Sequence, residues 1–264
     1  MSDDLDSYYR DHWLHVEEER MARYEAMFQW RDGYEALIAP AGIAAGQVVA
    51  DYGCGPGGLA IELARRVGPS GQVLAVDINR DFLTRTRAVA DELGLGDRVD
   101  TRLMEAERIP VEDGLVDRVV CKNVLEYVPD PEATIAEFHR IVKPGGVVHV
   151  SDSDWGGVVL EPLGERFTRL MSAASIAFRT PLIARRLYGM FRRVGFTDIR
   201  VQIIANADIT GGLRGVIYNM ASYARTSGKI GEAEIAAFVA DVDRAVEERT
   251  FLALLPQFLV TGRR

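Results

Sequence analysis

Apolar and polar positions follow two different rhythms along the chain. From residue 46 onward, short runs rich in Val and Ala are followed by longer stretches in which apolar residues recur every three or four positions. The first rhythm is typical of buried strands and the second of amphipathic helices. The pattern predicts strands at 47–52, 72–77, 99–104, 116–121 and 146–151, and helices at 58–67, 80–93 and 131–142. Strands and helices that alternate at this period pair in parallel through right-handed crossovers, so we expect an α/β fold with a doubly wound, mostly parallel sheet.

Both ends of the chain carry more helical sequence than the centre. Apolar and aromatic side chains are helically spaced over 7–38, which predicts one or two amphipathic helices before the Pro and Gly at 39–42. After residue 155, the pattern predicts helices at 165–177, 181–194 and within 212–250, and strands at 197–204 and 258–261. We therefore divide the chain into an N-terminal helical cap segment (1–38), a Rossmann-like core (39–155) and a C-terminal part of the sheet with an inserted helical lid (156–264).

The charge balance argues against nucleic acid as a partner. The 264 residues carry a formal net charge of −8, so binding to a phosphate backbone would require a local basic patch. The densest candidate consists of Arg185, Arg186, Arg192 and Arg193. Its helical spacing is typical of a solvated helix face.

Cysteine and hydropathy patterns limit the class further. Cys54 and Cys121 are the two cysteines, and neither has a CxxC partner or a nearby His pair, so we expect no disulfide framework and no metal site. The N-terminus is acidic, and the chain has no apolar run of about 18 residues, so we expect no signal peptide and no membrane span. The expected location is the cytoplasm.

The strongest chemical signal is a glycine-rich turn between a strand and a helix. The segment 48–58 reads VVADYGCGPGG, and its turn contains Gly53, Cys54, Gly55 and Gly57. Glycines allow a backbone to approach a ligand closely, and the start of the next helix offers unpaired N–H groups. The turn therefore indicates a site for an adenosyl ligand. Because Gly58 completes a dinucleotide-like spacing, the glycines alone do not exclude NAD.

Two acidic residues distinguish between NAD and other adenosyl ligands. Asp51 ends the strand just before the turn, where the pyrophosphate of a dinucleotide would lie, and a carboxylate there repels phosphate but suits an amino group and a sulfonium. Asp77 ends the next strand and can accept hydrogen bonds from both hydroxyls of a ribose. Together with the glycines, these acids favour S-adenosylmethionine. A cap on the turn is the other interpretation of Asp51, and a small turn residue is our interpretation of Cys54.

The sequence resembles class I S-adenosylmethionine-dependent methyltransferases, specifically their UbiE-like, type 11 group. DYGCGPGG at 51–58 and VLAVDIN at 73–79 resemble the first motif of the family and its successor. Three later segments agree, namely LMEAERIP at 103–110, VDRVVCKNVLEYVPD at 116–130 and KPGG at 143–146. The resemblance covers roughly residues 36–155. It implies a Rossmann-like sheet of seven strands with a reversed last strand.

The resemblance also implies roles for individual residues. The turn at 53–57 would lie under the methionyl portion of the cofactor, Asp77 would bind the ribose, and Ile78 would pack on the adenine. Glu105 and Ala106 would border the amino edge of the adenine, although the family more often has Asp where Glu105 stands. Asn123, with Val124 beside it, would face the cofactor near the sulfonium. An ordinary strand-end acid is the other interpretation of Glu105, and a turn or cap residue that of Asn123.

The acceptor is expected beyond the carboxyl ends of the strands, near Tyr127 and the loop SDSDWGG at 151–157. We regard Tyr127 as a candidate catalytic residue, Asp152 or Asp154 as a polar anchor or base, and Trp155 as a wall. An acidic turn that caps the next segment is an equal alternative for the two aspartates. The other acceptor-binding candidates come from the cap and the lid: Tyr9, Trp13, Trp30, Arg179 and Tyr218.

These observations predict methyl transfer from S-adenosylmethionine to an O, N or C atom of a small-molecule acceptor, with S-adenosylhomocysteine as product. Such a transfer is an in-line displacement, so the protein chiefly positions the acceptor and excludes water. The alternatives are use of the cofactor in a rearrangement or cyclisation, NAD-dependent oxidoreduction, and cofactor binding by a non-catalytic partner. The lack of a Tyr-x-x-x-Lys pair disfavours the oxidoreductase. The sequence leaves a homodimer open.

Overall fold

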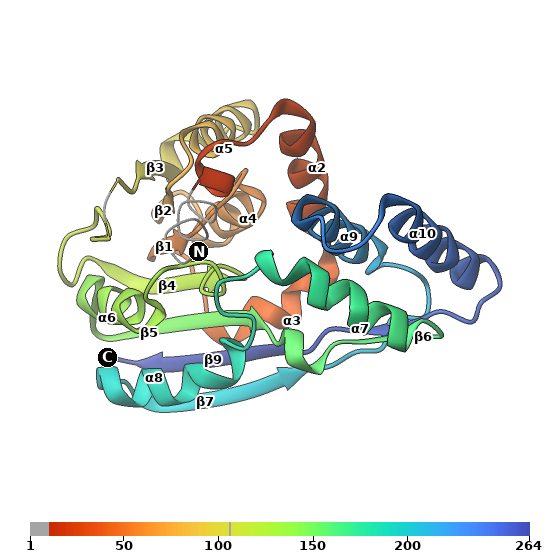
Figure 1. Cartoon of the computed structure of the whole chain (residues 1–264). Coiled ribbons are helices and arrows are strands. Elements are labelled where there is room, and N and C mark those ends of the chain that lie inside the picture. The colour runs from red at the N-terminus through yellow and green to blue at the C-terminus, as the bar shows by residue number, and fades with distance from the viewer. Residues whose placement is uncertain (1–10, 106) are drawn as a thin grey trace.

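Seven strands form the main sheet of the computed structural model, which describes residues 11–105 and 107–264. They are β1 (Val48–Tyr52), β2 (Gln72–Asp77), β3 (Val99–Leu103), β4 (Val116–Lys122), β5 (Val142–Ser153), β7 (Thr197–Ile204) and β9 (Gln257–Arg263). Their order is β3-β2-β1-β4-β5-β9-β7 (Figure 1). Strands β1 to β5 pair in parallel, and β9 runs antiparallel between β5 and β7. The predicted doubly wound sheet with a reversed last strand is confirmed.

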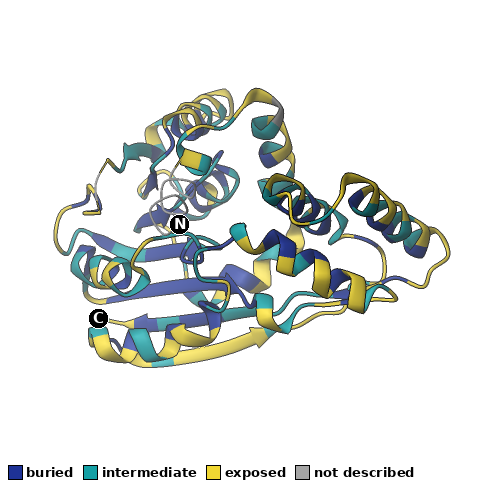
Figure 2. Cartoon of the chain, viewed as in Figure 1, coloured by how far each residue is buried: buried dark blue, intermediate teal, exposed yellow. Residues whose placement is uncertain are grey.

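Helices cover both faces of this sheet. One face packs against α3 (Glu35–Ile38), α4 (Gly58–Val67) and α5 (Arg80–Glu92), and the other against α6 (Pro131–Ile141) and α8 (Leu187–Val194). The central strands are buried along most of their length, as the dark blue arrows of Figure 2 show. Burial on both faces explains why the parallel strands appear in the sequence as continuous apolar runs.

The strand register places three strand ends at one level. Tyr52, the last residue of β1, pairs with Val76 of β2 and with Cys121 of β4. The turns that follow these strands therefore meet at one edge of the sheet. In a doubly wound sheet, the carboxyl edge is where ligands bind.

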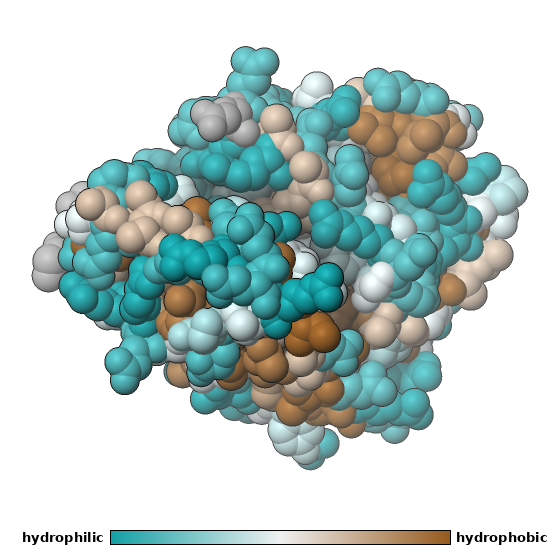
Figure 3. Space-filling model, turned by 90° about the vertical axis from the view of Figure 1, so that its right-hand side faces the viewer, coloured by the Kyte–Doolittle hydropathy of each residue, from teal (hydrophilic) through white to brown (hydrophobic). Residues whose placement is uncertain are grey.

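The C-terminal insertions, which the sequence analysis predicted as a lid, form a helical unit with its own core, and we keep the name lid for this unit. The lid contains α7 (Gly164–Ala173), α9 (Arg214–Ser227), α10 (Glu232–Glu247) and a two-stranded sheet of β6 (Val159–Glu161) and β8 (Leu252–Leu254). Their apolar side chains pack on one another, with Phe167, Phe238 and Tyr223 among the buried members. From the side where α9 and α10 lie, the surface is mainly hydrophilic with hydrophobic areas between (Figure 3).

Two local features differ from the sequence prediction, and the structure gives the bounds of two stretches that were predicted to be helical. The helix expected at 181–194 begins at Leu187, after a 3-10 turn at Ala184–Arg186. The stretch 212–250 is two helices, because Gly228 ends α9 with a left-handed φ of 64°. The N-terminal segment contains α2 (Glu18–Phe28) and the short α3. Strands β6 and β8 were not predicted, since three residues are too few for an alternating pattern. Among the described residues, no helix has the length and apolar character needed to cross a membrane.

Candidate cofactor and acceptor site

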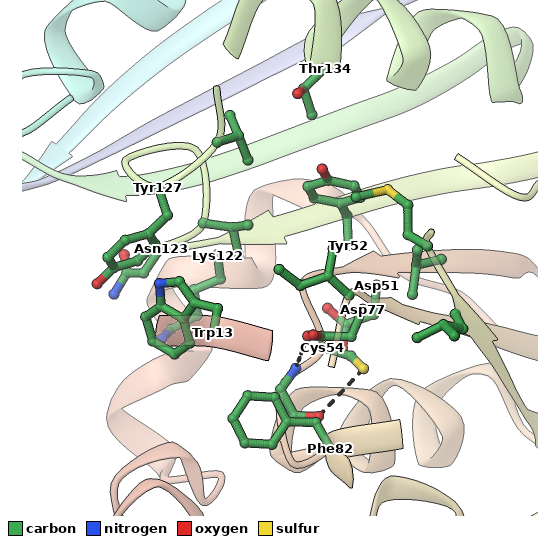
Figure 4. A pocket seen from close by; sticks show the side chains of 18 of the residues that line it. Trp13, Asp51, Tyr52, Cys54, Asp77, Phe82, Lys122, Asn123, Tyr127 and Thr134 are labelled. Atoms are coloured by element: carbon green, nitrogen blue, oxygen red, sulfur yellow. Dashed lines mark hydrogen bonds between the residues drawn. The ribbon is translucent and has the colours of Figure 1, made fainter. Parts of the chain in front are cut away.

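A large cavity lies where β1, β2 and β4 end. Its volume is about 1540 Å³, and its walls come from the glycine turn, from the loops after β2, β3 and β4, and from the N-terminal segment. Figure 4 shows Asp51, Asp77 and Cys54 in one part of the cavity and Trp13, Asn123 and Tyr127 in another. Pockets for a single drug-sized ligand usually measure about 300–1,000 Å³. This cavity therefore has room for a cofactor and a second small molecule.

The glycine turn can adopt its path only because Gly53 and Gly57 have no side chains. Gly53 has a φ of 72°, and a Cβ there would lie 2.4 Å from Cγ2 of Val124. Gly57 has a φ of 92°, and its Cβ would lie 2.6 Å from Oγ1 of Thr86. The backbone N–H groups of Gly53 and Cys54 both donate to the carbonyl of Val76, which ties the turn to β2. Gly53, Cys54 and Gly55 line the cavity, whereas Gly57 lies just behind its wall.

Asp51 is a buried carboxylate with an unused oxygen. It is 1% exposed, and its Oδ2 has no hydrogen-bond partner among the described residues. Burial raises the pKa of Asp51 to about 7, the charge of Asp77 acts in the same direction, and Lys122 opposes it. An unsatisfied buried acid is costly unless a ligand supplies a donor or a cation. The observation favours a cationic ligand over the cap interpretation of this residue.

Asp77 is held by the backbone on both sides. Its Oδ2 accepts from the N–H of Gly55 at 2.8 Å, and its Oδ1 accepts from the N–H of Asn79 at 2.9 Å. Burial raises the pKa of Asp77 to about 6, and these two hydrogen bonds act against the rise. Each carboxylate oxygen has a second lone pair. Asp77 can therefore accept from two ligand hydroxyls while it stays fixed.

The predicted adenine end is more open. Ile78, Met104 and Glu105 line the cavity, and the Glu105 side chain is 78% exposed and pairs with Arg80 at 3.6 Å. A side chain this exposed can move at little cost, so Glu105 is not fixed in the way that Asp77 is. Ala106 lies outside the described residues.

Asn123 and Val124 follow β4 and line the cavity, and Val124 packs against Gly53 of the glycine turn. Asn123 has a φ of 53°, a left-handed conformation that Asn tolerates better than most side chains. Its N–H donates to the carbonyl of Ser151 at 2.8 Å, so the chain turns sharply away from β4 here. Asn123 is therefore a turn residue and also lines the cavity.

Aromatic side chains form the remaining wall. Trp13 contacts Tyr127 edge to face at 4.8 Å between ring centroids and stacks on Tyr24 at 5.4 Å. Trp13, Trp30, Tyr127 and Arg179 all line the cavity. The Asn79 amide donates to the carbonyl of Trp13 at 2.7 Å, which ties the N-terminal segment to the start of α5. Tyr9 lies outside the described residues.

The two aspartates of the 151–157 loop do not reach the cavity, which corrects their interpretation as anchor or base. Asp152 is 0% exposed and accepts from the N–H groups of Leu125 at 3.0 Å and Ser153 at 3.1 Å. Asp154 forms an ion pair with Arg185 at 2.5 Å. Both carboxylates hold loops in place, which agrees with the alternative interpretation of an acidic turn. The position of the two aspartates on the loop could be predicted from the sequence, but the direction of their side chains could not.

Trp155 and Tyr218 also lie elsewhere. The indole N–H of Trp155 donates to Oε2 of Glu126 at 2.6 Å, and its ring stacks on Phe178 at 4.3 Å. The hydroxyl of Tyr218 donates to Asp243, which joins α9 to α10. Neither lines the large cavity. Both stabilise the lid and its contact with the core.

The sequence analysis missed Lys122 and Tyr34, which line the cavity. Nζ of Lys122 lies 4.7 Å from the ring centroid of Tyr34. Burial lowers the pKa of Lys122, and the charges of Asp152 and Asp51 oppose this. A charged residue at the end of an apolar strand was the signal that could have identified it. Among the described residues, no cluster of His, Cys, Asp or Glu could hold a metal ion.

Fold and site together define a Rossmann-like protein that binds an adenosyl cofactor at the carboxyl edge of its sheet. Residues 43–193 match the family model described as methyltransferase domain, and the chain belongs to this family. The family uses S-adenosylmethionine, and the residues present fit it: the unpartnered oxygen of Asp51 suits its amino group, and the turn at Gly53 leaves space that a Cβ would fill.

Among similar proteins, the ubiquinone/menaquinone biosynthesis C-methyltransferase UbiE of Cupriavidus taiwanensis is 40% identical over 114 residues, 43% of this chain and 46% of that protein. The chain spans less than half the length of the curated relatives it matches. Geranyl diphosphate C-methyltransferase from Streptomyces coelicolor A3(2) has a similar structure, with a TM-score of 0.57 at 20% identity over 88% of this chain and 77% of that one. Phosphoethanolamine N-methyltransferase 2 from Haemonchus contortus gives a TM-score of 0.63 at 18% identity over 94% and 57%. These two structures share the fold.

Proposed function

We propose that this protein transfers a methyl group from S-adenosylmethionine to an O, N or C atom of a small-molecule acceptor. The observation that carries the proposal is the composition of the large cavity at the ends of β1, β2 and β4. One part contains a glycine turn flanked by Asp51 and Asp77, and the other contains aromatic side chains. Relatives named as C-methyltransferases of ubiquinone/menaquinone biosynthesis and of geranyl diphosphate support a small-molecule acceptor.

The cofactor, when bound, supplies a methyl group activated by a sulfonium. Asp51 would bind the methionyl amino group through its unpartnered Oδ2, and Asp77 would accept from the ribose hydroxyls. Ile78 would pack on the adenine, and Asn123 would lie near the reacting centre. Fixed groups of this kind hold the methyl group in one direction, which is the main requirement of an in-line displacement.

The chain's own residues would position the acceptor and exclude water. Trp13, Trp30 and Tyr127 give the acceptor chamber an apolar, aromatic wall. Burial and the charge of Glu126 raise the pKa of Tyr127 well above its ordinary value of 10, so its hydroxyl keeps its proton at neutral pH. Tyr127 would therefore act as a neutral aromatic wall that positions the acceptor, and not as a base. Asp152 and Asp154 are turned away from the cavity, so neither would act as a general base on the acceptor.

Calorimetric titration tests the cofactor part of the proposal. We expect S-adenosylmethionine and S-adenosylhomocysteine to bind and NAD not to bind. Asp77→Ala should weaken both by at least about tenfold, since it removes hydrogen bonds to a charged acceptor. Asp100→Ala is the matched control, because Asp100 lies on β3 and pairs with Arg102. Failure of the wild type to bind either ligand, or preference for NAD, would refute the proposal.

Turnover tests the transfer itself. Incubation with methyl-labelled S-adenosylmethionine and a panel of phenols, amines and activated carbon acids should move label to at least one acceptor and release S-adenosylhomocysteine. An acceptor that is rearranged or cyclised without release of S-adenosylhomocysteine would instead support the non-methylating alternative.

A further inference from the structure

We propose that Lys122 is the counter-ion of a carboxylate bound in the cavity, and that the carboxylate it fits best is that of the methionyl end of the cofactor. This inference rests on the proposed function. It begins with the position of Lys122 as the last residue of β4. Asp51 pairs with Val120 in the neighbouring strand, so Lys122 lies two residues further toward the carboxyl edge. Residues two apart on a strand share a face. Asp51 and Lys122 therefore project from the same face of adjacent strands.

The ammonium group of Lys122 lies in the cavity wall against an aromatic ring. Among residues 11–105 and 107–264, its contact is the face of the Tyr34 ring, and no hydrogen bond or ion pair reaches Nζ. A ring face within about 6 Å attracts a cation but does not neutralise it. A partly buried ammonium without a counter-ion is costly, because it has lost part of its hydration. The ammonium of Lys122 therefore lies in the cavity wall, where a bound anion could pair with it.

Asp51 lines the same cavity and, among the described residues, also has an unpartnered oxygen. Oδ2 of Asp51 has no partner, and Asp51 and Lys122 are further apart than the 4.0 Å of an ion pair, although each affects the pKa of the other. A gap between one unpaired acid and one unpaired base matches an α-amino acid group, which carries an ammonium and a carboxylate on one carbon. Asp51 would take the ammonium and Lys122 the carboxylate. Gly53, which lines the cavity beside them, leaves the space free of side chains.

A carboxylate in this cavity could also come from the acceptor, since Trp13 and Tyr127 line the same cavity as Lys122 (Figure 4). Calorimetry on the whole chain with four probes separates the two sources. S-adenosylhomocysteine carries both charges, decarboxylated S-adenosylmethionine lacks the carboxylate, and 5′-methylthioadenosine lacks the whole amino acid. The fourth probe, 4-hydroxybenzoate, is an aromatic carboxylate and is titrated into protein saturated with S-adenosylhomocysteine.

For Lys122→Met we expect the Kd of S-adenosylhomocysteine to rise about 10- to 100-fold, as expected for loss of a charged hydrogen bond. The Kd values of decarboxylated S-adenosylmethionine and 5′-methylthioadenosine should change less than twofold, which also shows that the variant is folded. Lys122→Arg should keep most of the affinity. Lys229→Met is the matched control, because Lys229 bonds to Ser175 in the lid.

The outcomes are separable. Unchanged affinity for S-adenosylhomocysteine together with lost binding of 4-hydroxybenzoate would assign the carboxylate to the acceptor. Unchanged affinity for both, or an equal loss for all four probes, would overturn the role of Lys122 and leave the proposed function standing. A wild type that binds neither S-adenosylhomocysteine nor 5′-methylthioadenosine would overturn both.

Discussion

The imidazole of His12 joins the N-terminal segment to helix α9 of the lid. Its Nε2 lies 2.9 Å from the hydroxyl of Tyr223, and its Nδ1 lies 3.1 Å from Nη1 of Arg20. A guanidinium can only donate, so Nδ1 accepts and the ring proton on Nε2 points to Tyr223. Burial lowers the pKa of His12 to about 4, and Arg20 acts in the same direction, so the ring is neutral at pH 7. The next residue, Trp13, lines the cavity. This hydrogen bond therefore holds one wall of the acceptor chamber.

Tyr223→Phe should loosen that wall. The change removes the oxygen that accepts from His12 and leaves the ring contact at 5.3 Å in place. Loss of one buried hydrogen bond is worth about 1 kcal/mol, so amide exchange over residues 12–28 should accelerate roughly fivefold. Tyr188→Phe on α8 is the control, because Tyr188 is 51% exposed. Equal exchange over 12–28 in the wild type and Tyr223→Phe would show that other contacts hold the segment.

Gly53→Ala should destabilise the protein and weaken cofactor binding. The new Cβ would lie 2.4 Å from Val124, in addition to the cost of a positive φ. Gly228→Ala is a matched control, because its φ of 64° is also left-handed but no atom lies within 4 Å of the new Cβ. Denaturant unfolding should give a loss of about 1–2 kcal/mol for Gly228→Ala and a larger loss, of several kcal/mol, for Gly53→Ala. Equal losses would mean that Val124 moves aside.

The fold could be predicted from the sequence because its strands are determined locally. Continuous apolar runs such as 48–52 bury both faces of a strand wherever they lie in the chain, and Asn79 and Asp130 cap α5 and α6 through hydrogen bonds to nearby N–H groups. Strands β6 and β8 could not be predicted in this way. Each has three residues, and they pair only because the lid brings 159–161 beside 252–254.

The site was predictable where backbone geometry requires a residue type. Gly53 and Asp77 belong to turns whose conformation admits few alternatives, and both lie at the cavity. Side-chain direction was not predictable, because one residue along a strand reverses it. Asp152 points into the protein, whereas Ser153 next to it bonds Gln257 on the other face. Lys122 was missed because the motif that identified Asn123 assigns no role to the residue before it.

His149 should make the protein more stable as the pH rises from about 4 to 6.5. It is 0% exposed, and its Nε2–H donates to the carbonyl of Leu37 at 2.7 Å, while its Nδ1 accepts from Thr261 at 2.9 Å. Burial lowers the pKa of His149 to about 4. Between that value and 6.5 the unfolded chain binds more protons than the folded one, so stability is lost as the pH falls through this window.

The difference between the unfolding free energies of the wild type and His149→Gln isolates this term from those of the carboxylates. It should decrease by about 2–3 kcal/mol between pH 7 and pH 4. A difference that is independent of pH would contradict the assignment of a neutral, buried ring.

The carboxyl of Asp51 should change stability with pH in the sense opposite to His149. The variant Asp51→Asn should separate the effect of this carboxyl on stability from its effect on ligand binding. Burial raises the pKa of Asp51 to about 7, from an ordinary value of 3.8. Between these values the folded chain holds the proton that the unfolded chain has lost, so this carboxyl lowers stability as the pH rises from about 4 to 7. Asn cannot ionise and removes the penalty. At pH 8 the variant without ligand should therefore be more stable than the wild type by an amount on the order of 1–3 kcal/mol, and near pH 3.5 the two should be equal.

The same variant should bind S-adenosylhomocysteine at least about tenfold more weakly, because the amino group of the ligand loses its charged partner. Thermal unfolding at the two pH values, with and without S-adenosylhomocysteine, measures both effects. A variant that is less stable at pH 8 and binds as tightly as the wild type would show that Asp51 holds the turn and not the ligand, which is the cap interpretation that its sequence position also allowed.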